Sequence, residues 1–168
     1  PIVLWIDEIE KAFAAGGESD GGVSSRLLGS FLRWMQDRSD GVFVVATAND
    51  VSALPPEFLR KGRFDEVFFV DLPDATARRA VLELHLAGRN LDPETFEIDK
   101  LVEASNGFSG AEIEAAVVGA LYRSFAAGTT PSTDDLLAEV METMPLSSTR
   151  ADDVAALRAW GRAHAVVA

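Results

Sequence analysis

The feature that most constrains the fold is an apolar run at the start of the chain that stops abruptly at two carboxylates. After Pro1, residues 2–6 are all apolar, and Asp7 and Glu8 follow directly. Such a short, continuous run is typical of a strand buried on both faces, as in the parallel sheets of α/β proteins. Ligands of these sheets gather at the carboxyl ends of the strands, so the two acids are candidates for chemistry.

Two adjacent acids at a strand end have two interpretations. In the first, a divalent cation carrying phosphates offsets the cost of holding two carboxylates together. In the second, the acids simply open the helical turn predicted over residues 9–13, where negative charge favours the positive end of the helix dipole. The stretch alone does not distinguish them.

Composition excludes several classes of protein. The chain has 168 residues, 48% of them hydrophobic, which suffices for one sizeable core or a core with a small satellite domain. It contains neither a membrane-spanning apolar stretch nor a signal peptide, so we expect a cytoplasmic protein without membrane contact. Without cysteine and with two histidines, any metal is expected to bind oxygen ligands. The net charge of −12, without a cluster of Lys and Arg, disfavours nucleic-acid binding.

The start of the chain predicts that it is a piece of a longer protein, because it begins inside the expected strand without a methionine. Residues 14–22 are rich in glycine and predict a mobile loop. This loop is not a phosphate-binding loop, since the required Gly-Lys-Ser/Thr sequence occurs nowhere in the chain.

The next elements predict a parallel α/β arrangement. Apolar residues spaced three and four apart between Leu27 and Met35 indicate an amphipathic helix that ends at Asp40–Gly41. A second buried strand is predicted over 42–46, and a strand–helix–strand unit gives parallel strands. The polar groups after the second strand, Thr47 and Asn49, are therefore expected at the same edge as the two acids.

The rest of the chain predicts one more strand and then helices. Residues 54–63 indicate a helix of one or two turns, and residues 67–70 a third strand. Asp74 can cap a helix to about 87, another spans 98–104, and a capping box at Ser109 and Glu112 opens a helix through 126. The same device is predicted at Ser132 with Asp135 and at Thr149 with Asp152. We predict a partial α/β core over 1–73 and a helical domain over 74–168.

At this point the motifs resemble those of the AAA ATPase family. Residues 2–8 look like its Walker B strand, 42–49 like the strand that carries sensor 1, 54–65 like the region of the arginine fingers, and 107–112 like the start of the sensor-2 helix. The sequence of residues 4–11 resembles most the uncharacterised single-module AAA proteins of cyanobacteria, plastids and other bacteria. The resemblance implies the C-terminal part of a P-loop NTPase core followed by an all-α lid domain.

The resemblance also implies roles for the polar residues at the sheet edge. Asp7 would position Mg²⁺, and Glu8 would polarise the water that attacks the γ-phosphate of ATP. Asn49 would hold that water or a phosphate oxygen. The alternative for Asn49 is a turn residue, because Asn-Asp after a strand is a common way to begin a turn.

Arg60 and Arg63 would be arginine fingers that enter a neighbouring subunit's nucleotide site, as suits a permanently charged group that matches phosphate oxygens. The alternative is local pairing of Arg63 with Asp65 or Glu66. The finger interpretation requires a homo-oligomer, which the resemblance implies is a hexameric ring.

In the helical domain, the resemblance places His85, Gly110 and Ala111 near the adenine and ribose. A lone histidine on a mostly apolar helix is more often a core residue, so this role of His85 depends on the resemblance alone.

Two features depart from the family: Asp50 follows the sensor asparagine where many members have arginine, and residues 129–168 extend the helical domain.

The expected function is Mg²⁺-dependent ATP hydrolysis by a ring that remodels a protein partner. The alternative is a nucleotide-dependent scaffold or regulator with slow hydrolysis. Because the phosphate-binding loop is absent, the 168 residues alone are expected neither to bind ATP tightly nor to hydrolyse it.

Overall fold

The computed structural model describes residues 1–13, 23–37, 41–60 and 62–167, which form two compact units. The first unit comprises residues 1–69 and 159–166, and the second comprises residues 70–158 and 167. The predicted glycine-rich loop at 14–22 lies outside the described residues. The domain division predicted from the sequence, 1–73 and 74–168, stays a prediction; the two units differ from it in placing residues 159–166 with the N-terminal part.

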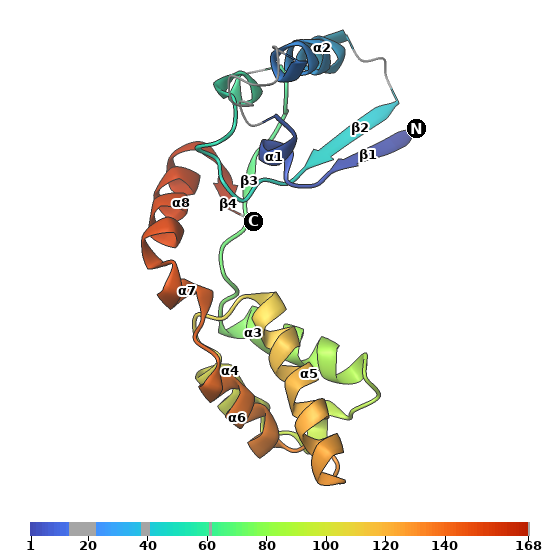
Figure 1. Cartoon of the computed structure of the whole chain (residues 1–168), viewed down its shortest axis with the longest axis vertical. Coiled ribbons are helices and arrows are strands. Elements are labelled where there is room, and N and C mark those ends of the chain that lie inside the picture. The colour runs from blue at the N-terminus through green and yellow to red at the C-terminus, as the bar shows by residue number, and fades with distance from the viewer. Residues whose placement is uncertain (14–22, 38–40, 61, 168) are drawn as a thin grey trace. The chain divides into compact units, whose positions relative to one another are not determined.

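The first unit contains the predicted pair of parallel strands. β1 (Ile2–Ile6) pairs with β2 (Val42–Ala46) in parallel, with Ile2 opposite Val42 and Ile6 opposite Ala46. α1 (Ile9–Phe13) and α2 (Val23–Asp37) lie between them in the chain (Figure 1). Both strands and α1 have the predicted bounds, and α2 ends at Asp37 in the described residues, before the predicted Asp40–Gly41.

Apolar residues from both helices form the core of this unit. Phe13 of α1 stacks on Phe31 of α2 with ring centroids 5.0 Å apart, and it also contacts Phe58 at 5.3 Å. Phe58 belongs to a short 3-10 helix, η1 (Pro56–Leu59), which lies inside the helix predicted over 54–63 and is shorter than it in the described residues. Since Ile6 and Ala46 pack against this cluster, the carboxyl ends of both strands are fixed to the core.

The prediction that β1 is buried on both faces is wrong for the described residues. Val3 and Trp5 of β1 are 66% and 63% exposed, and Phe43 of β2 is 67% exposed. Alternate residues of a strand point to opposite faces. Val3 and Trp5, with Phe43 opposite Val3, therefore share one exposed face. On the other face Leu4 and Ile6 are half-buried, and Ile2 at the start of the strand is exposed.

The third predicted strand forms, but in a different sheet. β3 (Phe68–Phe69) pairs with β4 (Val166–Val167) near the C-terminus, and these two make a separate two-stranded sheet. The backbone N–H of Val166 donates to the carbonyl of Val67 at 2.9 Å. The sequence pattern did not predict β4, because a two-residue apolar segment carries no periodicity.

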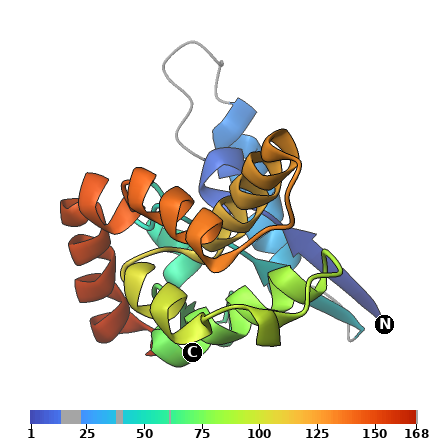
Figure 2. The ribbon, with the colours of Figure 1, turned by 90° about the horizontal axis from the view of Figure 1, so that it is seen from below.

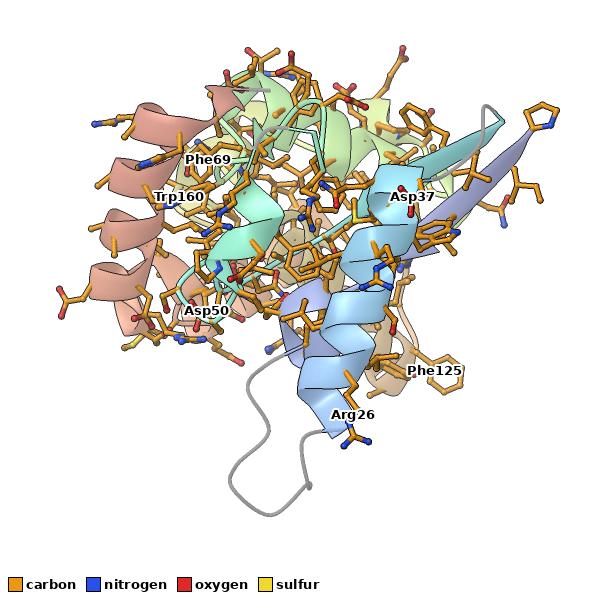
Figure 3. The ribbon with its side chains drawn as sticks, turned by 90° about the horizontal axis from the view of Figure 1, so that it is seen from above. Arg26, Asp37, Asp50, Phe69, Phe125 and Trp160 are labelled. Atoms are coloured by element: carbon orange, nitrogen blue, oxygen red, sulfur yellow. The ribbon has the colours of Figure 1, made fainter. Side chains whose placement is uncertain are left out.

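A glycine in the last helix, α8 (Ala151–His164), permits close packing on β3. A Cβ atom added to buried Gly161 would lie 2.5 Å from Cγ of Phe69. Figure 3 labels Phe69 and Trp160, the residue before this glycine. Trp160 stacks on His164 with ring centroids 5.2 Å apart.

Replacing Gly161 by Ala is expected to destabilise the protein, by about 1–3 kcal/mol, because the Phe69 ring must move to admit the new methyl group. The matched control is Gly29→Ala in α2, where no atom lies within 4 Å of the added Cβ. There the better helix propensity of alanine should raise stability by about 0.5–1 kcal/mol. Urea denaturation of both variants measures the two effects, and equal shifts in the same direction would contradict the packing argument.

The second unit is helical. α3 (Ala75–Ala87), α4 (Ile98–Ala104), α5 (Gly110–Ala127) and α6 (Thr133–Glu142) pack side by side, and Figure 2 shows the same helices from below. A short 3-10 helix, η2 (Pro93–Thr95), and α7 (Leu146–Thr149) complete the unit. Its core contains Phe96, Phe108 and a set of almost fully buried aliphatic side chains, among them Leu82, Leu86, Leu101, Ile113, Val117 and Leu136.

Most of the predicted helix caps are confirmed. Asp74 accepts a hydrogen bond from the Ala77 amide, and both Ser109–Glu112 and Ser132–Asp135 form reciprocal capping boxes. The cap predicted at Thr149 is wrong. Thr149 is the last residue of α7, and its hydroxyl donates to the Leu146 carbonyl at 3.4 Å, because the chain is already helical before it.

Arg78 is a buried charge that ties this unit together. It is 7% exposed, and its guanidinium donates to the carbonyl of Val102 in α4 and to the carbonyl of Pro73. Carbonyl oxygens near a helix C-terminus carry partial negative charge, so they stabilise a cation there.

No helix among the described residues has the length and apolar character needed to cross a bilayer.

Candidate functional site

The carboxyl ends of β1 and β2 are joined by backbone hydrogen bonds. The Thr47 amide donates to the Ile6 carbonyl at 2.9 Å, and the Ile9 amide donates to the Thr47 carbonyl at 2.9 Å. These bonds continue the parallel pairing beyond the last residues of both strands. The prediction that the polar residues after the two strands meet at one edge is therefore confirmed.

Thr47 orients the first acid of this edge. Its hydroxyl donates to Oδ1 of Asp7 at 2.5 Å and accepts a hydrogen bond from the Glu8 amide at 3.0 Å. The sequence placed Thr47 at the edge but gave it no role. Because one hydroxyl uses both its donor and its acceptor capacity here, Thr47 fixes the carboxylate of Asp7 relative to the backbone of Glu8.

Glu8 is held by two side chains. Nδ2 of Asn49 donates to Oε1 of Glu8 at 3.0 Å, and Nζ of Lys11 contacts Oε2 at 2.6 Å. The backbone of Glu8 is in the left-handed region, with φ of +49°, which costs a non-glycine residue of the order of 1–2 kcal/mol. Such a conformation persists where its surroundings hold it, and here the amide of Glu8 is bonded to Thr47.

Lys11 was not predicted as part of this site. The hydrogen bond to Glu8 raises the pKa of Lys11 above its ordinary value of 10.5, desolvation opposes the shift, and Glu8, Glu10 and Asp7 add to it. The ammonium is therefore charged at neutral pH. The lysine side chain is 68% exposed, so solvent screens its ion pair with Glu8 and the pair adds little to stability.

Glu10 is the third acid of the segment and is buried, with 4% of its surface exposed. Its Oε1 accepts a hydrogen bond from the Asn49 amide at 3.2 Å, and its Oε2 is buried without a partner in the described structure. Glu10 was assigned no role from the sequence, because no local pattern predicts its contact with Asn49, which lies 39 positions later in the chain.

The two arginines lie outside this network. Arg60 follows η1 in an extended conformation and is exposed. Arg63 is partly buried, and its Nη1 is buried without a hydrogen-bond partner in the described structure. Hydrogen bonds among the described residues join Asp7, Glu8, Thr47 and Asn49, and neither arginine side chain takes part in them.

His85 lies in the second unit and is neither isolated nor fully buried. Its Nδ1 is 3.3 Å from Nη1 of Arg89 and 3.7 Å from Oε1 of Glu114. Arg89 donates to Glu114 at 2.9 Å. That hydrogen bond, supported by His85, holds the pKa of Glu114 below its ordinary value of 4.5. The histidine thus belongs to a polar cluster between α3 and α5.

Gly110 and Ala111 are the first residues of α5. No atom lies within 4 Å of the position that a Cβ of Gly110 would take, so the space beside this glycine is open. Glu112 accepts from the amide and hydroxyl of Ser109 and, through Oε1, from the Leu146 amide at 2.7 Å. Burial raises the pKa of Glu112, but these hydrogen bonds outweigh it and hold the pKa below 4.5. The start of α5 is therefore fixed by the Glu112 carboxylate.

The side chains at the sheet edge suit a Mg²⁺ ion that is also bound by phosphates and water. They do not suit a metal ion held by protein ligands alone. No group of three or more acidic or histidine side chains in the described part of the chain could hold an ion. Mg²⁺ is commonly bound by one or two carboxylates together with phosphates and water. Asp7 is exposed and oriented by Thr47, which suits that kind of binding.

A parallel strand pair that delivers Asp-Glu and Asn to one edge is consistent with an α/β core that binds a nucleotide at the carboxyl ends of its strands. Residues 1–72 match the model of one such family, "ATPase family associated with various cellular activities (AAA)". These residues include Asp7, Glu8, Asn49, Arg60 and Arg63. The chain belongs to the AAA family.

Several relatives also match, and most of the close ones are uncharacterised. The chain is 42% identical to the "Uncharacterized AAA domain-containing protein ycf46" of Pyropia yezoensis, over 98% of this chain and 34% of that protein. It is 41% identical to the ycf46 protein of Guillardia theta, over 97% of this chain and 33% of that protein. It is 37% identical to the "ATP-dependent zinc metalloprotease FtsH" of Mesoplasma florum, over 68% of this chain and 18% of that protein. The chain spans about a third of the length of the ycf46 proteins that it matches.

Proposed function

We propose that the protein containing this chain is a Mg²⁺-dependent ATPase whose sites lie between the subunits of a ring, and that hydrolysis serves to remodel a protein partner. The observation that carries the proposal is the hydrogen-bonded set Asp7, Thr47, Glu8 and Asn49 at one sheet edge. Family membership supports ATP as the nucleotide. The cytoplasmic location stays a prediction.

Each residue of the set has a task that its chemistry suits. Asp7, held by Thr47, supplies the carboxylate that positions Mg²⁺. Glu8 accepts the proton of the attacking water, and Asn49 orients Glu8 through its amide. Mg²⁺ supplies charge neutralisation at the phosphates when it is bound.

Arg60 and Arg63 are proposed to act in a neighbouring subunit. The exposed position of Arg60 supports this, because its guanidinium can reach a ligand outside its own subunit. Nη1 of Arg63 has no hydrogen-bond partner in the described structure but is buried, so this side chain must turn outward to reach a neighbour. The second unit is proposed to be the lid over the nucleotide, with His85, Gly110 and Ala111 beside the adenine and ribose. The open space next to Gly110 supports that role.

One observation favours the alternative, a scaffold or regulator with slow hydrolysis. Each carboxylate oxygen of Glu8 already has one partner, Asn49 or Lys11, so a water molecule must use a remaining lone pair or displace one of them. The pair with Lys11 is exposed and screened by solvent, so a water molecule can displace it readily. The ATPase is therefore the main proposal.

The test is a phosphate-release assay on the whole protein with and without Mg²⁺. We expect turnover that requires Mg²⁺ and falls to background with EDTA. The 168 residues alone should show none, because they lack the Gly-Lys-Ser/Thr loop. Nucleotide binding by the whole protein without turnover would favour the scaffold, and turnover by the isolated 168 residues would contradict the proposal.

A further inference from the structure

Glu10 is an unusual carboxylate, because it is almost completely buried and only one of its oxygens has a partner. The side chain is 4% exposed, Oε1 accepts from the Asn49 amide, and Oε2 has no hydrogen-bond partner in the described structure. Burying a carboxylate is costly when it is not fully hydrogen-bonded. A single hydrogen bond only partly offsets that cost, so the acid at this position calls for an explanation.

The partner of Glu10 points to what the acid does. Asn49 donates its backbone N–H to Glu10 at 3.2 Å and its side-chain Nδ2 to Glu8 at 3.0 Å. One asparagine is thus held between two carboxylates of the same segment. Its backbone position is set by Glu10, and its side chain then reaches the acid that we propose as the base.

The remaining contacts of this region do not replace that bond. Thr47 joins the two strand ends through Ile6 and Ile9, but these bonds lie two residues before Asn49. Without the acceptor on Glu10, the Asn49 amide loses its partner, and the direction in which its side chain leaves the backbone is no longer fixed. Small displacements of groups in a reacting geometry can lower a rate by as much as about 100-fold.

We propose that Glu10 is a positioning residue for hydrolysis: it holds the backbone of Asn49 so that the Asn49 side chain stays on Glu8. The proposal rests on the proposed ATPase function. Glu10 itself contacts neither nucleotide nor water in this role. Its loss should therefore lower kcat and leave the KM for ATP nearly unchanged.

The kinetic test compares three variants of the whole protein. Glu10→Ala removes the acceptor and should lower kcat by about 10- to 100-fold. Glu10→Gln keeps an oxygen acceptor of the same reach and should stay within about threefold of the wild type, a difference small on the scale of one lost hydrogen bond. Met35→Ala is the control for lost stability. Met35 is 2% exposed in the apolar core of the first unit and belongs to none of the hydrogen bonds described at the sheet edge, so its loss should lower Tm but not kcat.

A double-mutant cycle separates positioning from general loss of stability. If Glu10 acts through Asn49, then Glu10→Ala should cost nothing further in kcat once Asn49 is replaced by Ala. Independent, multiplying losses in the double variant would overturn the proposal. So would a Glu10→Ala variant that is folded and has the kcat of the wild type.

A second measurement does not depend on ATP hydrolysis. Hydrogen exchange of the Asn49 amide, followed by NMR or mass spectrometry without nucleotide, should accelerate at least about tenfold in Glu10→Ala and change little in Glu10→Gln. Unchanged exchange in Glu10→Ala would overturn the positioning role. If exchange accelerates as expected but the wild-type protein shows no turnover, the contact is right and the proposed function is wrong. If Glu10→Ala does not fold, Glu10→Leu, which fills the same space without an acceptor, takes its place in both measurements.

Discussion

Replacing Glu8 by Gln in the whole protein is expected to lower kcat for ATP hydrolysis by about 1,000-fold, within the range that a general base contributes. The amide cannot take a proton from water, but its oxygen can still accept from Nδ2 of Asn49, as Oε1 of Glu8 does at 3.0 Å. The site should therefore keep its shape, bind ATP with the wild-type affinity, and hold it without hydrolysis. Single-turnover kinetics and retention of labelled ATP measure the two parts of this expectation.

The control is a carboxylate-to-amide change on the surface of α4. Glu103→Gln removes the same charge from an exposed side chain and should leave kcat unchanged. Glu10→Gln is a second, closer control, because Glu10 lies two residues from Glu8 and its amide replacement keeps the buried acceptor for the Asn49 N–H. It should lower kcat far less than Glu8→Gln does. If Glu8→Gln hydrolyses ATP at the wild-type rate, Glu8 is not the base and its contact with Asn49 serves another purpose.

The sheet edge could be predicted because it follows from a few local signals. Two apolar runs of strand length, an intervening helix and the rule for parallel strands were enough to bring Asp7 and Glu8 to the same edge as Asn49. Helix caps were predictable for the same reason. The Ser109–Glu112 and Ser132–Asp135 pairs depend on residues three apart, so tertiary packing has little influence on them.

What the sequence missed depends on contacts between distant residues. Lys11 was assigned no role from the sequence because its contact with Glu8 depends on the left-handed backbone conformation of Glu8, which no local pattern predicts. Glu10 is buried only because the segment that carries Asn49 folds over it. The exposure of Trp5 and Phe43 has the same cause: an apolar run predicts a strand, but the burial of each face depends on segments distant in the sequence.

Loss of Arg60 or Arg63 is expected to be as severe as loss of Glu8. Arginine fingers contribute about 1,000-fold or more to kcat in phosphoryl transfer. Arg60→Ala and Arg63→Ala should therefore lower kcat by about that factor and leave ATP binding nearly intact, because each arginine would contact the γ-phosphate of the neighbouring subunit. Neither side chain belongs to the hydrogen-bonded set at Asp7, so local misfolding of that set is not expected.

Mixing two inactive variants shows whether the arginine acts between subunits. An Arg63→Ala subunit keeps its own Glu8, and a Glu8→Gln neighbour keeps its own Arg63, so the interface between them holds one complete site. Activity should reappear when the two variants are mixed and allowed to exchange subunits. Mixtures of Arg60→Ala with Arg63→Ala are the control and should stay inactive, because every interface there lacks one arginine. If the first mixture is also inactive although mixed oligomers form, the arginines act within their own subunit, and the partnerless Nη1 of Arg63 needs another explanation.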